Sequence, residues 1–269
     1  MARFRIATWN INSVRLRLPL LKNLVAQARP HIIALQETKC PTELMPVEGL
    51  KALGYKYLRY TGMKGYNGVA FLSKLPLSEG VVHPRVGLLD CRHLETAVEL
   101  PDRRIVLHNL YIPAGGDIPD PALNVKYRHK LDFVDEMTAW FKKRHKANEQ
   151  VIALGDFNIA PHENDVWSHK QLLTVVSHTP AEVERLLAMQ ESLKWVDLGR
   201  AAVPLNEKLY TWWSYRNHDW RKSNRGRRLD HIWATPALAP DMKKMTVLSD
   251  ARDWPQPSDH VPVVAEFKF

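Results

Sequence analysis

The sequence predicts an α/β fold in which helices cover the faces of β-sheets. Short apolar runs typical of buried strands outnumber the segments with helical spacing, and the helical segments fall between strands. The chain has 269 residues, 45% of them hydrophobic, which is enough to bury a sizeable core. Because the sequence contains no short-period repeat and no low-complexity linker, we expect a single domain over residues 1–269.

The N-terminal part of the chain has one alternating segment and one segment with helical spacing. Residues 3–9 alternate between two faces, which predicts a strand. A helix should follow, because Pro19 suits a first turn, Pro30 stops a helix, and apolar residues recur at Leu21, Leu24, Val25 and Ala28. Short apolar runs then predict buried strands at residues 31–36, 69–72 and 105–110.

The C-terminal part repeats this mixture of helices and strands. A long helix is expected within residues 121–146, with an apolar side formed by Leu131, Val134, Thr138 and Phe141, and a second one at residues 182–189. Residues 159–180 are polar and lack periodicity, which predicts a loop. Further strands are expected at residues 151–154, 210–213, 229–234, 244–248 and 262–267.

The composition favours a basic cytoplasmic protein. There are 38 Lys and Arg against 29 Asp and Glu, a net charge of +9, which attracts polyanions but also occurs in ordinary soluble enzymes. The two cysteines, Cys40 and Cys91, form neither a disulfide framework nor a zinc-binding pattern, so a reducing compartment is expected. No apolar run approaches the roughly 20 residues of a membrane span, and the N-terminus does not resemble a secretory signal.

Polar residues collect where the predicted strands end. Asn10 closes the first strand, Glu37 follows the second, Tyr111 ends the 105–110 run, residues 155–158 (GDFN) close the 151–154 run, and residues 258–260 (SDH) precede the last strand. Taken singly, each is explained more simply as a surface acid, a turn residue or a cap. Ligands collect at strand ends in α/β sheets, so the whole set predicts a hydrolytic metal site.

A basic and aromatic segment, residues 212–228 (WWSYRNHDWRKSNRGRR), precedes the last of these clusters. Basic residues contact phosphates and aromatic faces accept bases or sugars, so we favour a DNA-binding loop over a solvated loop beside core tryptophans. The residues expected to contact DNA here are Trp212, Arg216, Arg221, Lys222, Asn224, Arg225 and Arg227.

Seven motifs together resemble the apurinic/apyrimidinic endonuclease family of the exonuclease III type, within the endonuclease–exonuclease–phosphatase superfamily. They are WN at 9–10, QETK at 36–39, GYNGVAFLSK at 65–74, NLYIP at 109–113, GDFN at 155–158, NRGRRLD at 224–230 and SDH at 258–260. The resemblance runs from residue 4 to about residue 267. GDFN with a downstream SDH occurs across the superfamily, and QETK alone is a weak signal, but QETK, NLYIP, GDFN, NRGRRLD and SDH together point to its DNA-repair branch.

This resemblance implies a four-layer α/β sandwich, in which two packed mixed β-sheets are flanked by helices. It implies Mg²⁺-dependent cleavage of duplex DNA, with Mn²⁺ as a substitute, on the 5′ side of abasic sites. Activities at 3′ ends, namely 3′→5′ exonuclease and 3′-phosphatase or 3′-phosphodiesterase, are also implied. A monomer acting on nucleoid DNA is expected.

The resemblance also assigns roles to single residues. Glu37 is the principal metal ligand, Tyr111 contacts the scissile phosphate, and Asp230 pairs with His260. Trp212 lines a pocket for a flipped abasic sugar, and Arg227 stands where the human-type endonuclease has Trp. The implied metal-site residues are Asn10, Glu37, Asp156, Asn158, Asp259 and His260; Asn10 and Tyr111 also contact DNA, and the catalytic set is Tyr111, Asp156, Asn158, Asp230 and His260.

Several alternatives stay open at this point. Asp156 needs a raised pKa to act as a base at neutral pH, and His260 is its rival for that role. Inositol-lipid phosphatases and sphingomyelinases share GDxN and SDH, but they would not need NRGRRLD. A non-catalytic DNA-binding module would explain the positive net charge. It would not explain why the chain carries five acidic and imidazole groups together, namely Glu37, Asp156, Asp230, Asp259 and His260.

Overall fold

The computed structural model describes residues 3–217 and 219–269 and contains two six-stranded mixed sheets. In the first sheet, β1 pairs in parallel with β2 and antiparallel with β14. Its strand order is β13 (Met242–Val247), β14 (Val263–Lys268), β1 (Arg3–Asn10), β2 (Ile32–Gln36), β4 (Val69–Ser73) and β3 (Tyr57–Thr61).

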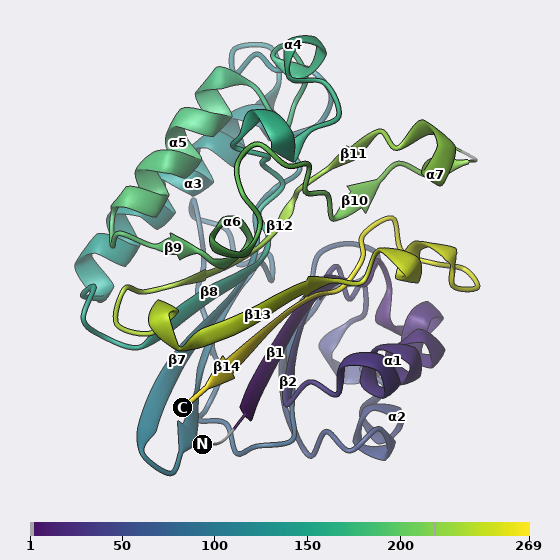
Figure 1. Cartoon of the computed structure of the whole chain (residues 1–269), viewed down its shortest axis with the longest axis vertical. Coiled ribbons are helices and arrows are strands. Elements are labelled where there is room, and N and C mark those ends of the chain that lie inside the picture. Colours follow the sequence, from purple (N-terminus) through teal and green to yellow (C-terminus); the bar gives the residue numbers. More distant parts are fainter. Residues whose placement is uncertain (1–2, 218) are drawn as a thin grey trace.

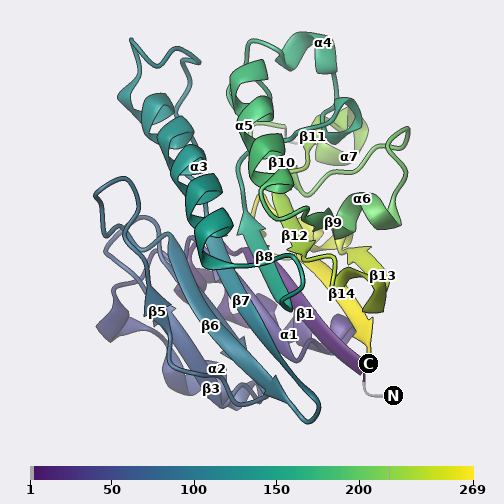
Figure 2. The same cartoon turned by 90° about the vertical axis from the view of Figure 1, so that its left-hand side faces the viewer.

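The second sheet has the same number of strands and lies against the first (Figures 1 and 2). Here β7 and β8 are parallel, and β12 runs antiparallel to β8. The strand order is β5 (Val81–Val82), β6 (His93–Leu100), β7 (Arg103–Tyr111), β8 (Val151–Asp156), β12 (Asp230–Ala234) and β9 (Val196–Asp197). A separate hairpin joins β10 (Trp212–Trp213) to β11 (Gly226–Arg227).

Strand alternation explains why the sheets are buried on both faces. In β1, Phe4 and Ile6 point into the core between the sheets, whereas Ala7 and Trp9 point to the outer side. Ile232 enters the same central core from the second sheet, and Trp233 faces outward. The outer faces need helices to cover them, which produces four layers. The predicted sandwich is therefore confirmed.

Helices α1 (Val14–Ala28) and α2 (Val47–Ala52) lie on the first sheet, and α3 (Val125–Arg144) and α5 (Pro180–Glu191) lie on the second (Figure 1). Both α3 and α5 begin at side-chain caps, from Asn124 and from Thr179. The short helices are α4 (His169–Leu172), α6 (Leu198–Ala202) and α7 (Trp220–Ser223), and 3₁₀ turns lie at Thr42–Leu44, Glu163–Asp165, Ala239–Asp241 and Ser249–Asp253.

The expected position of Pro19 was wrong. Helix α1 begins at Val14, so Pro19 lies inside the helix rather than in its first turn. The start is fixed by tertiary contacts, because the backbone N–H groups of Ser13 and Val14 donate to the carbonyls of Glu37 and Thr38. Within residues 3–217 and 219–269, no helix combines the length and apolarity needed to cross a membrane.

A chain of buried imidazoles lies between α3 and the second sheet. His93 Nε2 is 3.0 Å from His108 Nδ1, and His108 Nε2 is 2.9 Å from His145 Nε2. Arg85 donates to His93 Nδ1 at one end, and Glu149 accepts from His145 Nδ1 at the other. This direction of the hydrogen bonds fixes one tautomer for each ring. Burial, reinforced by the closeness of the other imidazoles and of arginine side chains, holds the pKa values of His93 and His108 well below the ordinary range, so both rings are neutral.

We expect these histidines to make the protein less stable in acid. The rings of His93 and His108 are neutral when folded and become protonated on unfolding below about pH 6.5, so the free energy of unfolding falls as the pH drops through that value. Replacing His108 by Gln, which can keep both hydrogen bonds, should reduce this dependence by about 1 kcal/mol per pH unit between about pH 7 and about pH 5. Urea unfolding between about pH 7 and about pH 5 measures it; equal slopes for the two proteins would contradict the neutral chain.

Candidate active site

The predicted polar clusters converge at one edge of the two sheets. Strand β1 ends at Asn10, β7 at Tyr111 and β8 at Asp156, and Glu37 follows the last residue of β2. Asp230 begins β12, which is antiparallel to β8, and it lies opposite Asp156 in the register. The sequence folds this way because the buried strands end together, so residues far apart in the chain meet.

Close backbone packing supports this edge of the second sheet. Gly155 of the GDFN motif has φ +142°, and a Cβ at this position would lie 1.9 Å from the carbonyl oxygen of Leu110 on β7. Asn109 of the NLYIP motif does not line the cleft. Its side chain accepts from Gln36 at 2.7 Å and donates to the carbonyls of Leu35 and Ala70, which ties the two sheets together.

Glu37 is an ionised carboxylate with three donors around it. Its Oε1 accepts from Asn10 Nδ2 and from the Tyr111 hydroxyl, each at 2.8 Å, and Lys39 Nζ lies 2.8 Å from Oε2. Burial raises the pKa of Glu37, but Lys39 and Asn10 lower it more, so the pKa is lowered overall. Burial and the Glu37 charge raise the pKa of Tyr111 well above its ordinary value, which keeps this hydroxyl a donor.

Lys39 and Asn12 belong to this network although the sequence analysis did not single them out. Lys39 Nζ donates to Asn12 Oδ1 at 2.7 Å, and Asn12 Nδ2 donates to Asp259 Oδ1 at 3.2 Å. Lys39 stands in the QETK motif and Asn12 two residues after Asn10, so motif membership was the only available signal. Their approach depends on left-handed backbone conformations at Asn12, Glu37 and Lys39.

Asp156 is fully buried and receives donors from two asparagines. Asn10 Nδ2 donates to Oδ2 at 2.8 Å, the backbone N–H of Asn158 donates to Oδ1 at 2.9 Å, and Asn158 Nδ2 donates to Oδ2 at 3.1 Å. Burial raises the pKa of Asp156 to about 7; Asp230 and Glu37 add to this rise, and His260 opposes it. Asn10 therefore bridges the carboxylates of Glu37 and Asp156.

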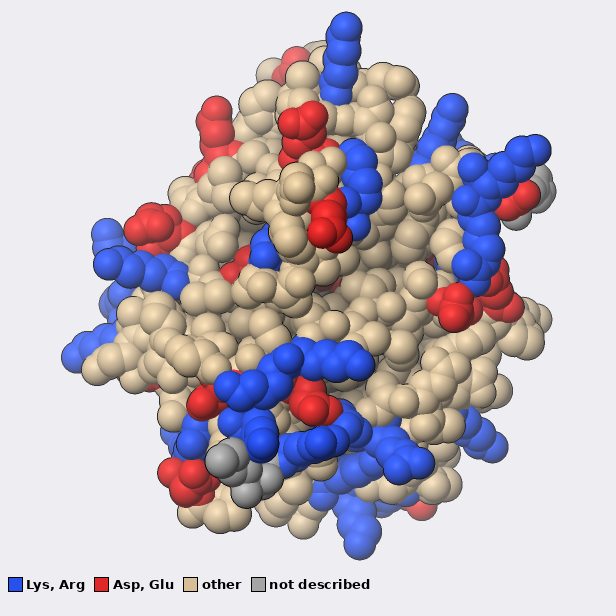
Figure 3. Space-filling view, in the orientation of Figure 1, with Lys and Arg blue, Asp and Glu red and all other residues tan. Residues whose placement is uncertain are grey.

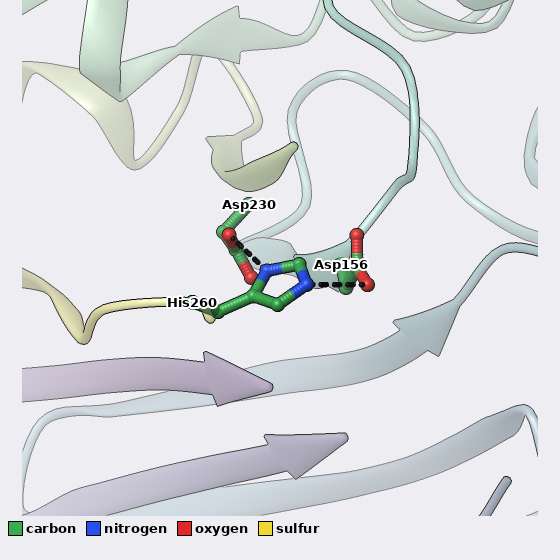
Figure 4. Close-up of side chains that lie close together, drawn as sticks. All are labelled: Asp156, Asp230 and His260. Carbon is green, nitrogen blue, oxygen red and sulfur yellow. Dashed lines mark hydrogen bonds and ion pairs between the residues drawn. The ribbon is translucent and has the colours of Figure 1, made fainter. Parts of the chain in front are cut away.

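His260 lies between two carboxylates, as Figure 4 shows. Its Nδ1 donates to Asp230 Oδ2 at 2.8 Å, and its Nε2 lies 3.7 Å from Asp156 Oδ2. Burial lowers the pKa of His260, but Asp230 and Asp156 outweigh burial and raise it to about 10. The ring is thus an imidazolium at neutral pH. Trp9 Nε1 donates to the backbone carbonyl of His260 at 3.0 Å and holds its loop in place.

A cleft of about 640 Å³ opens above these groups. Asp259 lies on its wall, where Oδ2 accepts from Trp212 Nε1 at 3.0 Å. Asn10, Asp156 and Asp230 lie buried beneath it. The predicted site residues that line the cleft are Glu37, Asn158, Trp212, Arg216, Arg225, Arg227, Asp259 and His260.

Three residues expected to contact DNA lie elsewhere. Arg221 forms ion pairs with Asp250 at 2.6 Å and with Asp253 at 2.5 Å, and Asn224 accepts from Trp213 Nε1 at 3.1 Å. Arg221 and Asn224 line a different pocket, and Lys222 is exposed on α7. Figure 3 shows basic and acidic side chains next to one another at the α7 end of this face. The structure thus divides the basic segment into two groups.

The donor set fits a hard divalent cation. The groups around the cleft offer carboxylate and amide oxygens, which such cations prefer. Ligand atoms of Asp156, Asp230 and His260 all lie within 4.8 Å of one another, and Asp230 Oδ1 is buried without a hydrogen-bond partner in the described part of the chain. Because His260 is protonated and paired, the oxygens of Glu37, Asp156, Asn158 and Asp259 are better suited to hold the ion than its ring.

The family assignment follows from a match over residues 7–260 to the endonuclease/exonuclease/phosphatase family. The chain belongs to this family. Over 98% of its length it is 28% identical to the whole of exodeoxyribonuclease III of Haemophilus influenzae. It is also 28% identical to the DNA repair nuclease APEX1 of Danio rerio, covering 97% of this chain and 81% of that protein.

Solved structures agree with this assignment. An AP endonuclease from Archaeoglobus fulgidus is 29% identical, with a TM-score of 0.90, over 99% of this chain and all of that one. The 3′-5′ exonuclease NExo from Neisseria meningitidis is 30% identical, with a TM-score of 0.87 and the same coverage. The prediction of a hydrolase of the DNA-repair nuclease class is confirmed, and the non-DNA phosphatase and binding-module alternatives are not supported. The roles of single residues stay predictions.

Asp230 should control the charge of His260. Replacing Asp230 by Asn removes the main group that raises the pKa of His260, so that pKa should fall from about 10 towards the ordinary histidine range. We expect the alkaline limb of kcat/KM for DNA cleavage to move to lower pH, with an activity loss of about tenfold or more near pH 8.5. If the maximal kcat/KM fell but the alkaline limb of its pH profile stayed in place, Asp230 would be only structural.

Proposed function

We propose that this chain is a Mg²⁺-dependent DNA repair nuclease that hydrolyses phosphodiesters in duplex DNA. The observation that carries the proposal is the convergence of an ionised Glu37, a buried Asp156 and a His260 imidazolium under one cleft edged by arginines and Trp212. Abasic sites and 3′ ends are the proposed substrates. The relatives support this choice, since they include an AP endonuclease, a 3′-5′ exonuclease, and a 3′ phosphatase bound to product DNA hairpin.

Each group then has a task that its environment allows. Glu37 would hold the cation, with Asn158 and Asp259 beside it; the ion would supply charge neutralisation at the phosphate and prefers oxygen ligands. Asp156 is the better candidate for accepting a proton from water, because its pKa of about 7 lies near neutral pH. His260 stays charged and would stabilise phosphate oxygen instead. The Tyr111 hydroxyl, which donates to Glu37 in this structure, would turn to donate to the same phosphate.

The cleft also suits a polyanionic substrate. Arg216 and Arg225 line it, and the guanidinium carbon of Arg225 lies 4.7 Å from the ring centre of Trp167. Cations placed along a groove beside aromatic faces are typical of nucleic-acid binding. With the net charge of +9, this favours duplex DNA over a neutral or lipid substrate.

The proposal includes a monomer that acts on nucleoid DNA in the bacterial cytoplasm. A monomer is supported by one observation: Glu37, Asp156, Asp230 and His260 all come from one chain. Cys40 and Cys91 are buried free thiols, which suits a reducing compartment.

The test compares an internal abasic site, a recessed 3′ end and a 3′-phosphate in the same duplex. We expect cleavage with Mg²⁺ or Mn²⁺ and none with EDTA. Glu37→Gln should lose about a hundredfold or more in turnover while keeping its circular dichroism spectrum and melting temperature.

A matched control is the substitution Glu99→Gln. Glu99 is exposed and pairs with Arg104 at 2.9 Å near the turn between β6 and β7, at the opposite end of β7 from Tyr111. This variant should keep full activity. The proposal fails if the wild-type protein is inert on all three substrates, or if Glu37→Gln is as active as the wild type with added metal.

A further inference from the structure

Two neighbouring arginines at the end of the basic segment have opposite surroundings. Arg228 is fully buried and paired, with Nε 2.7 Å from Asp165 Oδ1 and NH1 2.7 Å from Asp197 Oδ2. Arg227 points to the cleft instead, where NH1 donates to the carbonyl of Val176 at 3.0 Å and to Ser177 Oγ at 2.7 Å. A structural role explains Arg228 and leaves Arg227 unexplained.

The charge of Arg227 is not balanced by a neighbour. In the described ranges no carboxylate oxygen lies within the 4.0 Å of an ion pair with it, and its Nε is buried without a partner among those residues. The carboxylate that acts on it, Glu182, is fully buried against the equally buried Lys130 at 2.5 Å. Lys130 thus holds the Glu182 carboxylate in a close ion pair, and Arg227 has no such pair of its own among the described residues. A half-buried guanidinium in this state favours the arrival of an anion.

The position of Arg227 decides which anion this is. The backbone of Trp212 pairs with Arg227 on one side and with His260 on the other. Arg227 is thus two strand spacings, or about 10 Å, from His260 along the ladder, within reach of a long side chain. Its guanidinium carbon lies 5.2 Å from the centre of the Trp212 ring. A group next to the phosphate held at His260 would meet both the cation and the ring.

Two kinds of DNA end place different chemistry there. At an internal abasic site, the phosphate continues into a neutral deoxyribose, which would have to displace the guanidinium from the Trp212 face and would leave Nε without an acceptor. At a 3′-phosphate, the same position holds a terminal phosphate oxygen, and the group carries up to two negative charges and three acceptor oxygens. The second kind of end complements Arg227 and the first does not.

We propose that Arg227 is a specificity residue that directs this cleft towards 3′-phosphate ends of DNA and away from internal abasic sites. This inference rests on the proposed nuclease function and names its preferred substrate class. In the favoured reaction, water adds to phosphorus, the P–O3′ bond breaks and a proton passes to O3′, which gives inorganic phosphate and a 3′-hydroxyl end. Arg227 contributes by holding a non-esterified oxygen of the phosphate.

The experiment measures kcat/KM with Mg²⁺ on two versions of one duplex, one with a 3′-phosphate at a gap and one with an internal tetrahydrofuran abasic analogue. The wild type should prefer the 3′-phosphate. In Arg227→Leu we expect the ratio of 3′-phosphate removal to abasic incision to fall about tenfold or more, because a charge-assisted contact is lost and apolar room is gained.

Two further variants separate charge from structure. Arg227→Gln keeps an amide that can donate to Val176 and Ser177 but loses the charge, so its ratio should fall in the same direction even if Arg227→Leu folds poorly. Arg104→Leu makes the same substitution at an exposed arginine of the distant β6–β7 hairpin, and its ratio should equal that of the wild type.

The outcomes distinguish the two levels of the argument. If the wild type processes neither duplex, the proposed nuclease function fails. If the wild type processes both but prefers the abasic duplex, or if Arg227→Leu and Arg227→Gln keep the wild-type ratio, the inference about Arg227 is overturned and the nuclease function stands.

Discussion

An imidazolium held between two buried carboxylates is the interaction on which the rest of the centre depends. His260 belongs to the loop before β14 in the first sheet, whereas Asp156 and Asp230 belong to neighbouring strands of the second. Burying one of these charges alone would be strongly unfavourable, so each group requires the other two in place. The two sheets must therefore pack with these strand ends together, and the sandwich and its centre form as one arrangement.

The same packing separates the chemical roles of similar groups. Glu37 and Asp156 are both carboxylates bridged by the Asn10 amide, yet Lys39 keeps the pKa of one low, while burial and Asp230 raise the pKa of the other. Glu37, which stays ionised, then suits a cation, and Asp156 suits the acceptance of a proton. Because the side chains stand on rigid strand ends and meet through hydrogen bonds, this difference is built in before any substrate arrives.

The residues at strand ends could be predicted from the sequence because short apolar runs mark the buried strands β2, β4 and β8 clearly. The half-exposed edge strand β3 and the charged strand β6 lack such a signal and were missed. The basic segment could be recognised, but not which arginines face the cleft, since that depends on the two-residue strands β10 and β11 and on the four-residue helix α7. Lys39 joins the centre through left-handed turns that no periodicity reveals.

The protonation state of His260 tests the central claim most directly. Nitrogen NMR of the ¹⁵N-histidine-labelled protein would report both ring nitrogens, with the His260 signals assigned by their loss in His260→Gln. At about pH 8.5, where an ordinary histidine is neutral, the structure predicts that both nitrogens of His260 carry protons. A signal showing one unprotonated nitrogen at that pH would contradict the imidazolium between Asp156 and Asp230, and with it the division of roles derived above.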